Sequence, residues 1–331
     1  MELRDSRYNN VRLTFEEGPH KYTDNFGNEY LSMTTLLHNY EPKFDEAYWL
    51  RKKSKEYNMS EKKLKALWTT IKDEACERGS KTHNGLEDGI KEASKFAKAI
   101  EYLTDRKDGV MTTVADIPLF NAKQKLLDID EFIDKTGNRY TPIYDAFRRY
   151  TDNGYKIYSE IGVFNVDYLI SGTIDILLIR EDKFIIGDWK TNRGGLKFSS
   201  GYYKKDKTQK PQQLTDIWVE NNETLLPPVN NMAKCNGSIY NLQTTGYGYL
   251  TELILDIPCA GCWLCHIDND FVLNEYNQPK LFYDGYHLKD DPVEKITFYN
   301  MPYRKAEFAA ILADRKLRLD ASKINTQYSL L

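Results

Sequence analysis

The sequence predicts a folded α/β protein, and three observations lead to this fold class. The chain has 331 residues of which 41% are hydrophobic, enough to bury a sizeable core in one large domain or two smaller ones. Residues 41–150 carry apolar side chains at threefold and fourfold spacing, which is typical of helices. Residues 155–186 have the pattern of strands. Helices therefore precede a sheet, and we expect residues 1–331 to form a single domain.

Residues 1–40 are predicted to form a β-hairpin that flanks the rest of the domain. Between residues 11 and 37, apolar and polar side chains alternate around the turn signal DNFGN at residues 24–28. A helix start is predicted near residues 32–35, where the sequence is SMTT.

Residues 41–150 are predicted to be largely helical. One face of this region is apolar, whereas the opposite face is polar and rich in lysine. The apolar face is formed by Leu64, Leu67, Trp68, Ile71 and Ala75.

Residues 151–270 are expected to hold the core of the domain. Within them, residues 196–235 are predicted to be a long surface excursion, because the segment is polar and too irregular for a core element. The prolines that make it irregular are Pro211, Pro227 and Pro228.

The remaining elements are a helix, a strand and a second helix. The helix is predicted at IYNLQTTGYGYLTELIL, where Gly246 and Gly248 indicate either a close backbone approach or a weak helix. The strand is predicted at GCWLCHI. Residues 271–331 form a strand and helix region, which ends with a charged helix at about residues 304–319.

Three charges interrupt the apolar hairpin GTIDILLIREDKFIIGDWKTN at residues 172–192. If the turn is centred on residues 181–182, Asp175 and Asp188 are directly opposed across the two strands. Because side chains alternate along a strand, Lys190 lies on the same face as both acids. The opposite face carries Ile174, Ile176 and Leu178, so we expect one face of the hairpin to be core and the other to be a site.

Two opposed carboxylates about 5 Å apart at their Cβ atoms repel each other unless a cation lies between them. Hard oxygen ligands without a nearby thiolate favour Mg²⁺ or Mn²⁺ over zinc. The ammonium group of Lys190 adds a positive charge suited to a phosphate oxygen or an attacking water. The pattern therefore indicates hydrolysis of phosphodiesters.

An alternative is that these are exposed charges on ordinary strands. Glu-Asp is not a preferred two-residue hairpin loop, and a shift of one residue in register would put Asp175 and Asp188 on opposite faces. A four-residue turn from Arg180 to Lys183 keeps the predicted register.

Three ordered motifs resemble the PD-(D/E)XK nuclease superfamily and its RecB-like exonuclease branch. Asp175, followed by DWK at residues 188–190, is similar to the D…(D/E)xK signature. Upstream, GSKTHNGLE at residues 79–87 resembles the helical G-[ST]-x-x-H-x-x-x-E motif, and downstream QTTGY at residues 243–247 resembles the QxxxY motif. The segment HKYTDNFGNEYLSMTTLL resembles the lead-in of phage and mitochondrial-genome-maintenance-type exonucleases.

This resemblance implies a restriction-endonuclease-like core, in which a mixed central sheet is flanked by helices. It implies that Lys190 positions or activates the hydrolytic water. Glu160 takes the place of an additional acid that binds a second metal or a bridging water. It also implies that Gln243 and Tyr247 orient catalytic groups or contact the DNA backbone. The implied metal ligands are His83, Asp175, Asp188 and the backbone carbonyl of Trp189.

Structural roles remain open for several of these residues. His83 as a neutral imidazole is a better ligand for Mn²⁺ than for Mg²⁺, but a helical histidine also serves structural roles. Glu87 lies on the same helical face as His83 and is expected to make a surface hydrogen bond. Glu160 is alternatively a solvated acid at a strand end, and Tyr247 is alternatively a packed tyrosine.

Basic and aromatic side chains follow directly after Lys190, and we expect them to contact DNA. Lysine and arginine provide salt-dependent affinity for phosphates, and aromatic rings stack on unpaired bases. The alternative is a solvated loop, which is the interpretation we prefer for a second basic group at residues 51–55. The predicted DNA-binding residues are Arg193, Lys197, Tyr202, Tyr203, Lys204, Lys205 and Lys207, with Phe198 and Lys210 beside them.

The cysteines pose a separate question, because some RecB-like nucleases hold an iron–sulfur cluster with one upstream and three downstream cysteines. Cys76 lies upstream, and Cys259, Cys262 and Cys265 lie downstream. However, Cys262 and Cys265 would point to opposite faces of the predicted strand. We therefore expect small buried thiols rather than a cluster or a zinc site.

The predicted function is metal-dependent exonucleolytic hydrolysis of DNA in phage recombination, replication or repair. The alternatives are a site-specific or structure-specific endonuclease and a non-catalytic DNA-binding protein that retains the fold. The expected partner is a linear DNA end, single- or double-stranded, and a single-strand-binding or recombination protein is a further candidate. The balance of 46 basic and 49 acidic residues does not discriminate between partners.

We expect a cytoplasmic location without membrane contact, in the host cytoplasm if the chain is phage-encoded. No stretch reaches the ~18 consecutive apolar residues of a membrane span. The start MELRDSRYNN lacks the apolar segment of a secretory signal. Five cysteines, an odd number, do not indicate a secreted disulfide framework.

Overall fold

The computed structural model describes most of the chain. The described residues are 2–5, 7–8, 10–16, 18, 21–93, 110–118, 125–210 and 212–329. Three features of the sequence analysis lie outside them, namely His20 at the start of the lead-in, Pro211, and residues 94–109 and 119–124 of the predicted helical region.

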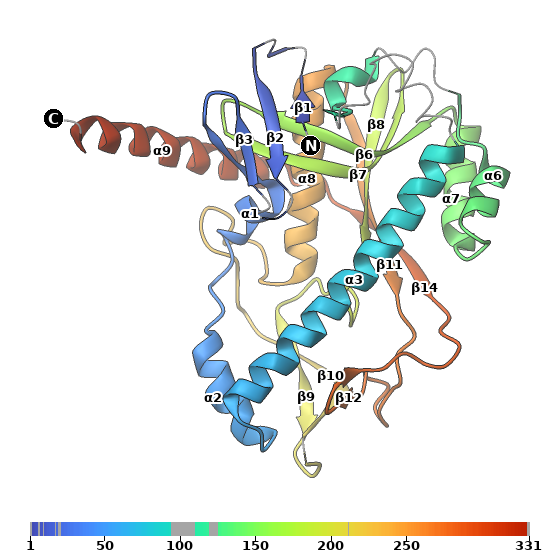
Figure 1. The fold of residues 1–331 in the computed structure, drawn as a ribbon, viewed down its shortest axis with the longest axis vertical. Helices are drawn as coiled ribbons and strands as arrows, with labels where there is room; N and C mark the ends of the chain where they lie inside the picture. The colour runs from blue at the N-terminus through green and yellow to red at the C-terminus, as the bar shows by residue number, and fades with distance from the viewer. Residues whose placement is uncertain are drawn as a thin grey trace.

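A large mixed sheet organises the molecule, which confirms the α/β class (Figure 1). Ten strands among the described residues join in this sheet in the order β14-β11-β8-β7-β4-β3-β2-β1-β5, with β6 paired to β7. The pairs β6–β7, β7–β8 and β11–β14 are antiparallel, whereas β8 and β11 are parallel. The central strands are β6 (Lys156–Asn165), β7 (Ile170–Arg180), β8 (Lys183–Lys190), β11 (Cys259–Asp268) and β14 (Lys295–Met301).

The predicted N-terminal hairpin is confirmed, and it extends the same sheet. The carboxylate of Asp24 accepts hydrogen bonds from the N–H groups of Phe26 and Asn28, while Gly27 provides the positive φ of the turn. β4 then pairs in parallel with β7, so this segment is part of the central sheet. Its strands are β1 (Glu2–Arg4), β2 (Arg12–Glu16), β3 (Lys21–Asp24), β4 (Glu29–Ser32) and β5 (Val110–Met111).

Helices cover both faces of the sheet. The helix predicted near residues 32–35 begins at Met33, where Ser32 caps it by accepting a hydrogen bond from the Thr35 N–H at 3.0 Å. Residues 41–150 are helical as predicted over most of their described length, but they also include β5 and a short 3-10 turn, η1 (Val114–Asp116). The helices are α1 (Met33–His38), α2 (Glu46–Glu56), α3 (Glu61–Ala93), α6 (Ile129–Lys135), α7 (Thr141–Asp152), α8 (Asn236–Leu255) and α9 (Lys305–Ser329). None of the helices described has the length and apolarity required to cross a membrane.

Two hydrophobic clusters lie on opposite faces of the sheet. The first includes side chains of α1, α8 and α9, and the second includes side chains of α3, α6 and α7. Leu177 and Ile186 each lie two residues from one of the two acids, on the same face of the hairpin as the acids, and both are fully buried in the first cluster. The interpretation that one hairpin face is core and the other is only a site is therefore wrong, because both faces are covered and the polar groups occupy one end.

The predicted surface excursion contains an ordered hairpin. β9 (Gly201–Asp206) and β10 (Gln213–Glu220) pair antiparallel and form a separate two-stranded sheet. Pro211 lies between these two strands in the sequence. A second small sheet contains β12 (Leu281–Phe282) and β13 (Gly285–Tyr286).

Close helix packing explains Gly246, one of the two α8 glycines considered in the sequence. A Cβ atom at Gly246 would lie 2.6 Å from Phe308 of α9 and 2.7 Å from Met33 of α1, so only glycine fits there. Of the two interpretations, close backbone approach is confirmed. The charged C-terminal helix is also present as α9, which is longer than predicted and projects away from the sheet (Figure 1).

The substitution Phe308→Ala is expected to destabilise the protein by about 3–5 kcal/mol, because it removes a fully buried ring that joins α9 to α8. The matched control is Leu317→Ala on the same helix, where the residue is 70% exposed and the change should stay within about 0.5 kcal/mol. Urea unfolding followed by circular dichroism measures both values. Equal unfolding midpoints would contradict the packing of α9 described above.

Candidate functional site

The three predicted motifs meet at one end of the β7–β8 hairpin. The hairpin pairs Arg180 with Lys183 and Ile176 with Gly187, which confirms the predicted register up to the residues next to the two acids. The Trp189 N–H donates a hydrogen bond of 3.0 Å to Asp175 Oδ2, so the two strands remain in contact at this level. α3 contributes His83, and α8 contributes the glutamine and tyrosine of the third motif.

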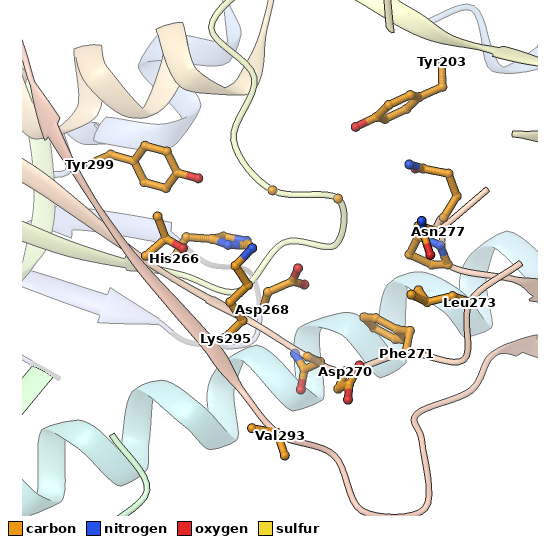
Figure 2. Close-up of a pocket in the computed structure, with 16 residues that line it drawn as sticks. Tyr203, His266, Asp268, Asp270, Phe271, Leu273, Asn277, Val293, Lys295 and Tyr299 are labelled. Carbon is orange, nitrogen blue, oxygen red and sulfur yellow. The ribbon is translucent and has the colours of Figure 1, made fainter. Parts of the chain in front are cut away.

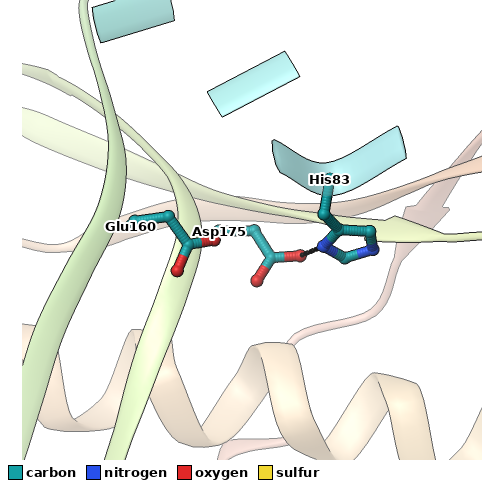
Figure 3. Close-up of side chains that lie close together, drawn as sticks. All are labelled: His83, Glu160 and Asp175. Atoms are coloured by element: carbon teal, nitrogen blue, oxygen red, sulfur yellow. Dashed lines mark ion pairs between the residues drawn. The ribbon is translucent and has the colours of Figure 1, made fainter. Parts of the chain in front are cut away.

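A glycine allows α3 to approach the hairpin closely. A Cβ atom at Gly79 would lie 3.0 Å from the Thr191 hydroxyl, directly after Lys190. One turn later, His83 Nδ1 lies 3.6 Å from Asp175 Oδ2 (Figure 3). Burial lowers the pKa of His83, although the Asp188 charge opposes this effect. A neutral imidazole facing a carboxylate is a suitable metal ligand.

Glu160 of β6 completes a group of three potential ligands with His83 and Asp175. One ligand atom from each residue lies within 4.8 Å of the others, and Figure 3 shows the two carboxylates on neighbouring strands with the imidazole beside them. Burial and then the charge of Asp175 raise the pKa of Glu160 to about 9. Its backbone has a φ of 52°, a conformation that costs about 1–3 kcal/mol for a non-glycine residue and is concentrated at functional sites.

Asp188 lies outside this group of three and is paired with Lys190. Its Oδ2 lies 2.6 Å from Lys190 Nζ, and its side chain is only 1% exposed. Among the described residues, Asp188 Oδ1 has no hydrogen-bond partner. Burial raises the pKa of Asp188 to about 6 although the nearby ammonium lowers it. A buried carboxylate oxygen without a partner is costly, and a bound cation would offset that cost.

The ammonium group of Lys190 also contacts side chains of α8. Lys190 Nζ donates a hydrogen bond of 3.2 Å to Gln243 Oε1. Tyr247 packs against the hairpin where a Cβ atom at Gly172 would lie only 2.9 Å from the tyrosine hydroxyl. Tyr240 was not among the predicted site residues, yet its ring centroid lies 4.5 Å from Lys190 Nζ. Its signal was its position three residues before Gln243, which puts both on one helical face.

Glu87 and Trp189, two further predicted site residues, make contacts within the protein. Glu87 forms an ion pair with Lys91 on α3, so it makes a surface contact of the predicted kind with a different partner. The side chain of Trp189 is buried in the second hydrophobic cluster, where it contacts Trp263. The predicted role of its backbone carbonyl stays a prediction.

The predicted DNA-binding residues are divided between internal contacts and free surface. Lys205 forms an ion pair with Glu56 of α2, and Lys197 Nζ lies 2.5 Å from the Tyr203 hydroxyl. The guanidinium of Arg193 lies 3.4 Å from the ring centroid of Tyr286. The exposed members are Tyr202, Lys204 and Lys207, so the residues do not form one continuous free row.

The cysteines of β11 follow the predicted alternation. Cys262 belongs to the first hydrophobic cluster and Cys265 to the second, which confirms that they lie on opposite faces of the strand. Cys259 Sγ lies 3.9 Å from Cys262 Sγ. Cys76 is exposed on α3.

Comparisons with known proteins leave the family open. A scan against protein-family models found no match, and a search of curated proteins found no match either. The likeness of the three motifs to RecB-like nucleases therefore stays a prediction, and the geometry of the site carries the functional argument. That geometry combines three acids, a neutral imidazole and a buried ammonium group.

The substitution Glu160→Gln is expected to stabilise the metal-free protein above neutral pH. The pKa of Glu160 is about 9 in the folded protein, whereas its ordinary value is 4.5. Between these two pH values, Glu160 therefore keeps its proton in the folded protein and loses it in the unfolded chain. The free energy of unfolding should therefore fall as pH rises through this window. Glutamine removes that dependence on pH and should raise the free energy of unfolding by about 1–3 kcal/mol at alkaline pH.

Urea unfolding in EDTA between about pH 5 and pH 8 measures this effect. The matched control is Glu220→Gln on β10, where the glutamate is exposed and the slope should equal that of the unmodified protein. An unchanged slope in Glu160→Gln would show that Glu160 ionises normally.

Proposed function

We propose that this protein is a metal-dependent DNA exonuclease with a PD-(D/E)XK-type site, similar to the RecB-like branch. The observation that carries the proposal is the meeting of three motifs, separated by more than one hundred and fifty residues, around the Asp188–Lys190 pair. A buried acid, a buried ammonium group and a neighbouring set of potential metal ligands are the groups that phosphodiester hydrolysis requires.

The residues present fit Mg²⁺ or Mn²⁺. The ligands that we propose are His83, Asp175 and Asp188 with the Trp189 carbonyl, and the proximity of Glu160 to Asp175 supports adding it to this set. Among the described residues, Asp188 Oδ1 has no hydrogen-bond partner, and the pKa of Glu160 is raised. Both features are unfavourable for charged carboxylates, and a bound cation would stabilise them. When bound, the metal would polarise the phosphate and lower the pKa of a bound water.

Lys190 is proposed to orient the attacking water and the phosphate rather than to remove a proton. Burial lowers its pKa, but the charges of Asp188 and Asp175 outweigh this and raise the pKa overall. The side chain therefore remains an ammonium group at neutral pH. Gln243 accepts one of its hydrogen bonds and the Tyr240 ring lies beside it, so the group has a defined direction.

Exposed basic and aromatic residues on β9 are proposed to receive the DNA. Tyr202 and Lys204 lie on one face of the strand, and Lys207 follows it. Such side chains suit a phosphate backbone with unpaired bases. A role in phage DNA recombination, replication or repair in the host cytoplasm, beside a single-strand-binding or recombination protein, belongs to this proposal.

Linear DNA labelled at its ends is expected to be degraded in Mg²⁺ or Mn²⁺ but not in EDTA, while covalently closed circles survive. Lys190→Ala and Asp188→Asn should each lower the rate by about 10²-fold or more, because the first removes a cation that stabilises the developing charge and the second removes a ligand proposed to hold the metal. Lys190→Ala should still bind DNA. Gel assays and anisotropy measure cleavage and binding.

The matched control is Lys183→Ala at the turn end of the same hairpin, which should cleave at the normal rate. Thermal melts of all variants test whether they fold, since Lys190→Ala and Asp188→Asn each break the buried Asp188–Lys190 ion pair. Undiminished cleavage in both site variants would refute the assignment, and cutting of closed circles would indicate an endonuclease.

Mn²⁺ is expected to raise the melting temperature by about 5 °C at a concentration one hundred times its dissociation constant, since it would bind only the folded site. Asp175→Asn should remove most of this shift. The control Asp216→Asn replaces an exposed acid on β10 and should retain it. Differential scanning calorimetry with and without Mn²⁺ measures the shift, and equal shifts in both variants would place the ion elsewhere.

A further inference from the structure

A cavity of about 400 Å³ lies beside the candidate site at the carboxyl ends of β8 and β11 (Figure 2). Its floor consists of alternate residues of β11 and β14, with His266 opposite Thr297 and Asp268 opposite Lys295. The loop that follows β8 passes over it through Gly194 and Gly195, and the segment after β11 closes the remaining side.

The floor of this cavity and the candidate site share one face of the sheet. In the parallel pair of β8 and β11, Leu264 lies beside Asp188 and His266 lies beside Lys190. Because side chains alternate, Asp188, Lys190, His266 and Asp268 all project from the same face. Adjacent strands are about 4.8 Å apart, so the cavity begins about one nucleotide from Lys190.

The lining of the cavity favours a neutral aromatic ligand. Asp270 forms an ion pair with Lys289 at 2.7 Å, and Asp268 is directly opposite Lys295 across the strands. The charged groups therefore balance, which disfavours a phosphate. Rings and amides are also part of the lining, namely Tyr203, Phe271, Tyr299, Asn277 and Gln278. Rings that stack and amides that pair with base edges are the usual means of holding an unpaired base.

We propose that this cavity, which we call the base pocket, binds one unpaired nucleobase of the strand whose phosphate lies at Lys190. The inference rests on the proposed nuclease function and specifies its substrate class as a single-stranded or frayed DNA end. A volume of about 400 Å³ admits one nucleotide and excludes a base pair with its backbone. A base within a duplex cannot enter unless it leaves the stack.

A scan with abasic oligonucleotides tests the base pocket without requiring catalysis. Single-stranded oligonucleotides, each lacking the base at one successive position, are bound to the unmodified protein in EDTA and followed by fluorescence anisotropy. Loss of the base at one position should weaken binding about tenfold, whereas loss elsewhere should have a smaller effect. Equal binding of all the oligonucleotides, or no binding of any, would overturn the base pocket.

A filled-pocket variant provides the second arm. Thr297→Trp places a large ring on the pocket floor, and it should weaken binding of the intact oligonucleotide about tenfold and remove the dependence on the abasic position. The matched control is Thr14→Trp, at an exposed position of β2 far from the pocket in the sheet order. Position dependence that persists in Thr297→Trp would also overturn the base pocket.

Parallel cleavage assays in Mn²⁺ separate this inference from the proposed function. Base-dependent binding without hydrolysis would refute the nuclease and retain the base pocket. Hydrolysis that is unaffected by every abasic position would retain the nuclease and refute the base pocket.

Discussion

Burial of three carboxylates around one ammonium group is the constraint on which the site depends. Glu160, Asp175 and Asp188 lie on three adjacent strands, but among the residues that the structure describes Lys190 forms an ion pair with Asp188 alone. The remaining charge is accommodated by raising the pKa of Glu160 and by leaving an oxygen of Asp188 without a partner among the described residues. These buried acids lower the stability of the folded state. The surrounding packing must offset that loss, and here both faces of the central strands are packed.

Glycines in the three motifs explain how separate elements reach this point. Gly79 lets α3 approach the end of β8, and Gly172 leaves room for the ring of Tyr247. Gly246 lets α8 pack against α1 and α9 from behind. A methyl group would clash at Gly172 and Gly246 and would make a tight contact at Gly79, so these glycines permit the short distances between the elements. The polar residues of the motifs then meet because the backbones are close.

One face of the sheet links the candidate site to the base pocket. The first hydrophobic cluster covers this face beneath α8, and polar residues replace apolar ones only toward the carboxyl ends of β8 and β11. Parallel neighbours bring these two ends together, which is why β8 and β11 both contribute. The hairpin of β9 and β10 lies alongside, joined to the segment after β11 by the bond from the Tyr276 hydroxyl to Asp206 at 2.9 Å.

The sequence by itself determined the features that depend on local periodicity. These include the register of the β7–β8 hairpin, the start of α1 after Ser32 and the opposite directions of Cys262 and Cys265. Only the tertiary structure decided that Tyr240 lies beside Lys190, that Glu56 pairs with Lys205 and that an ordered hairpin occupies residues 201–220. The physical reason is that alternation specifies which way a side chain points, whereas its partner depends on the packing of elements far apart in the chain.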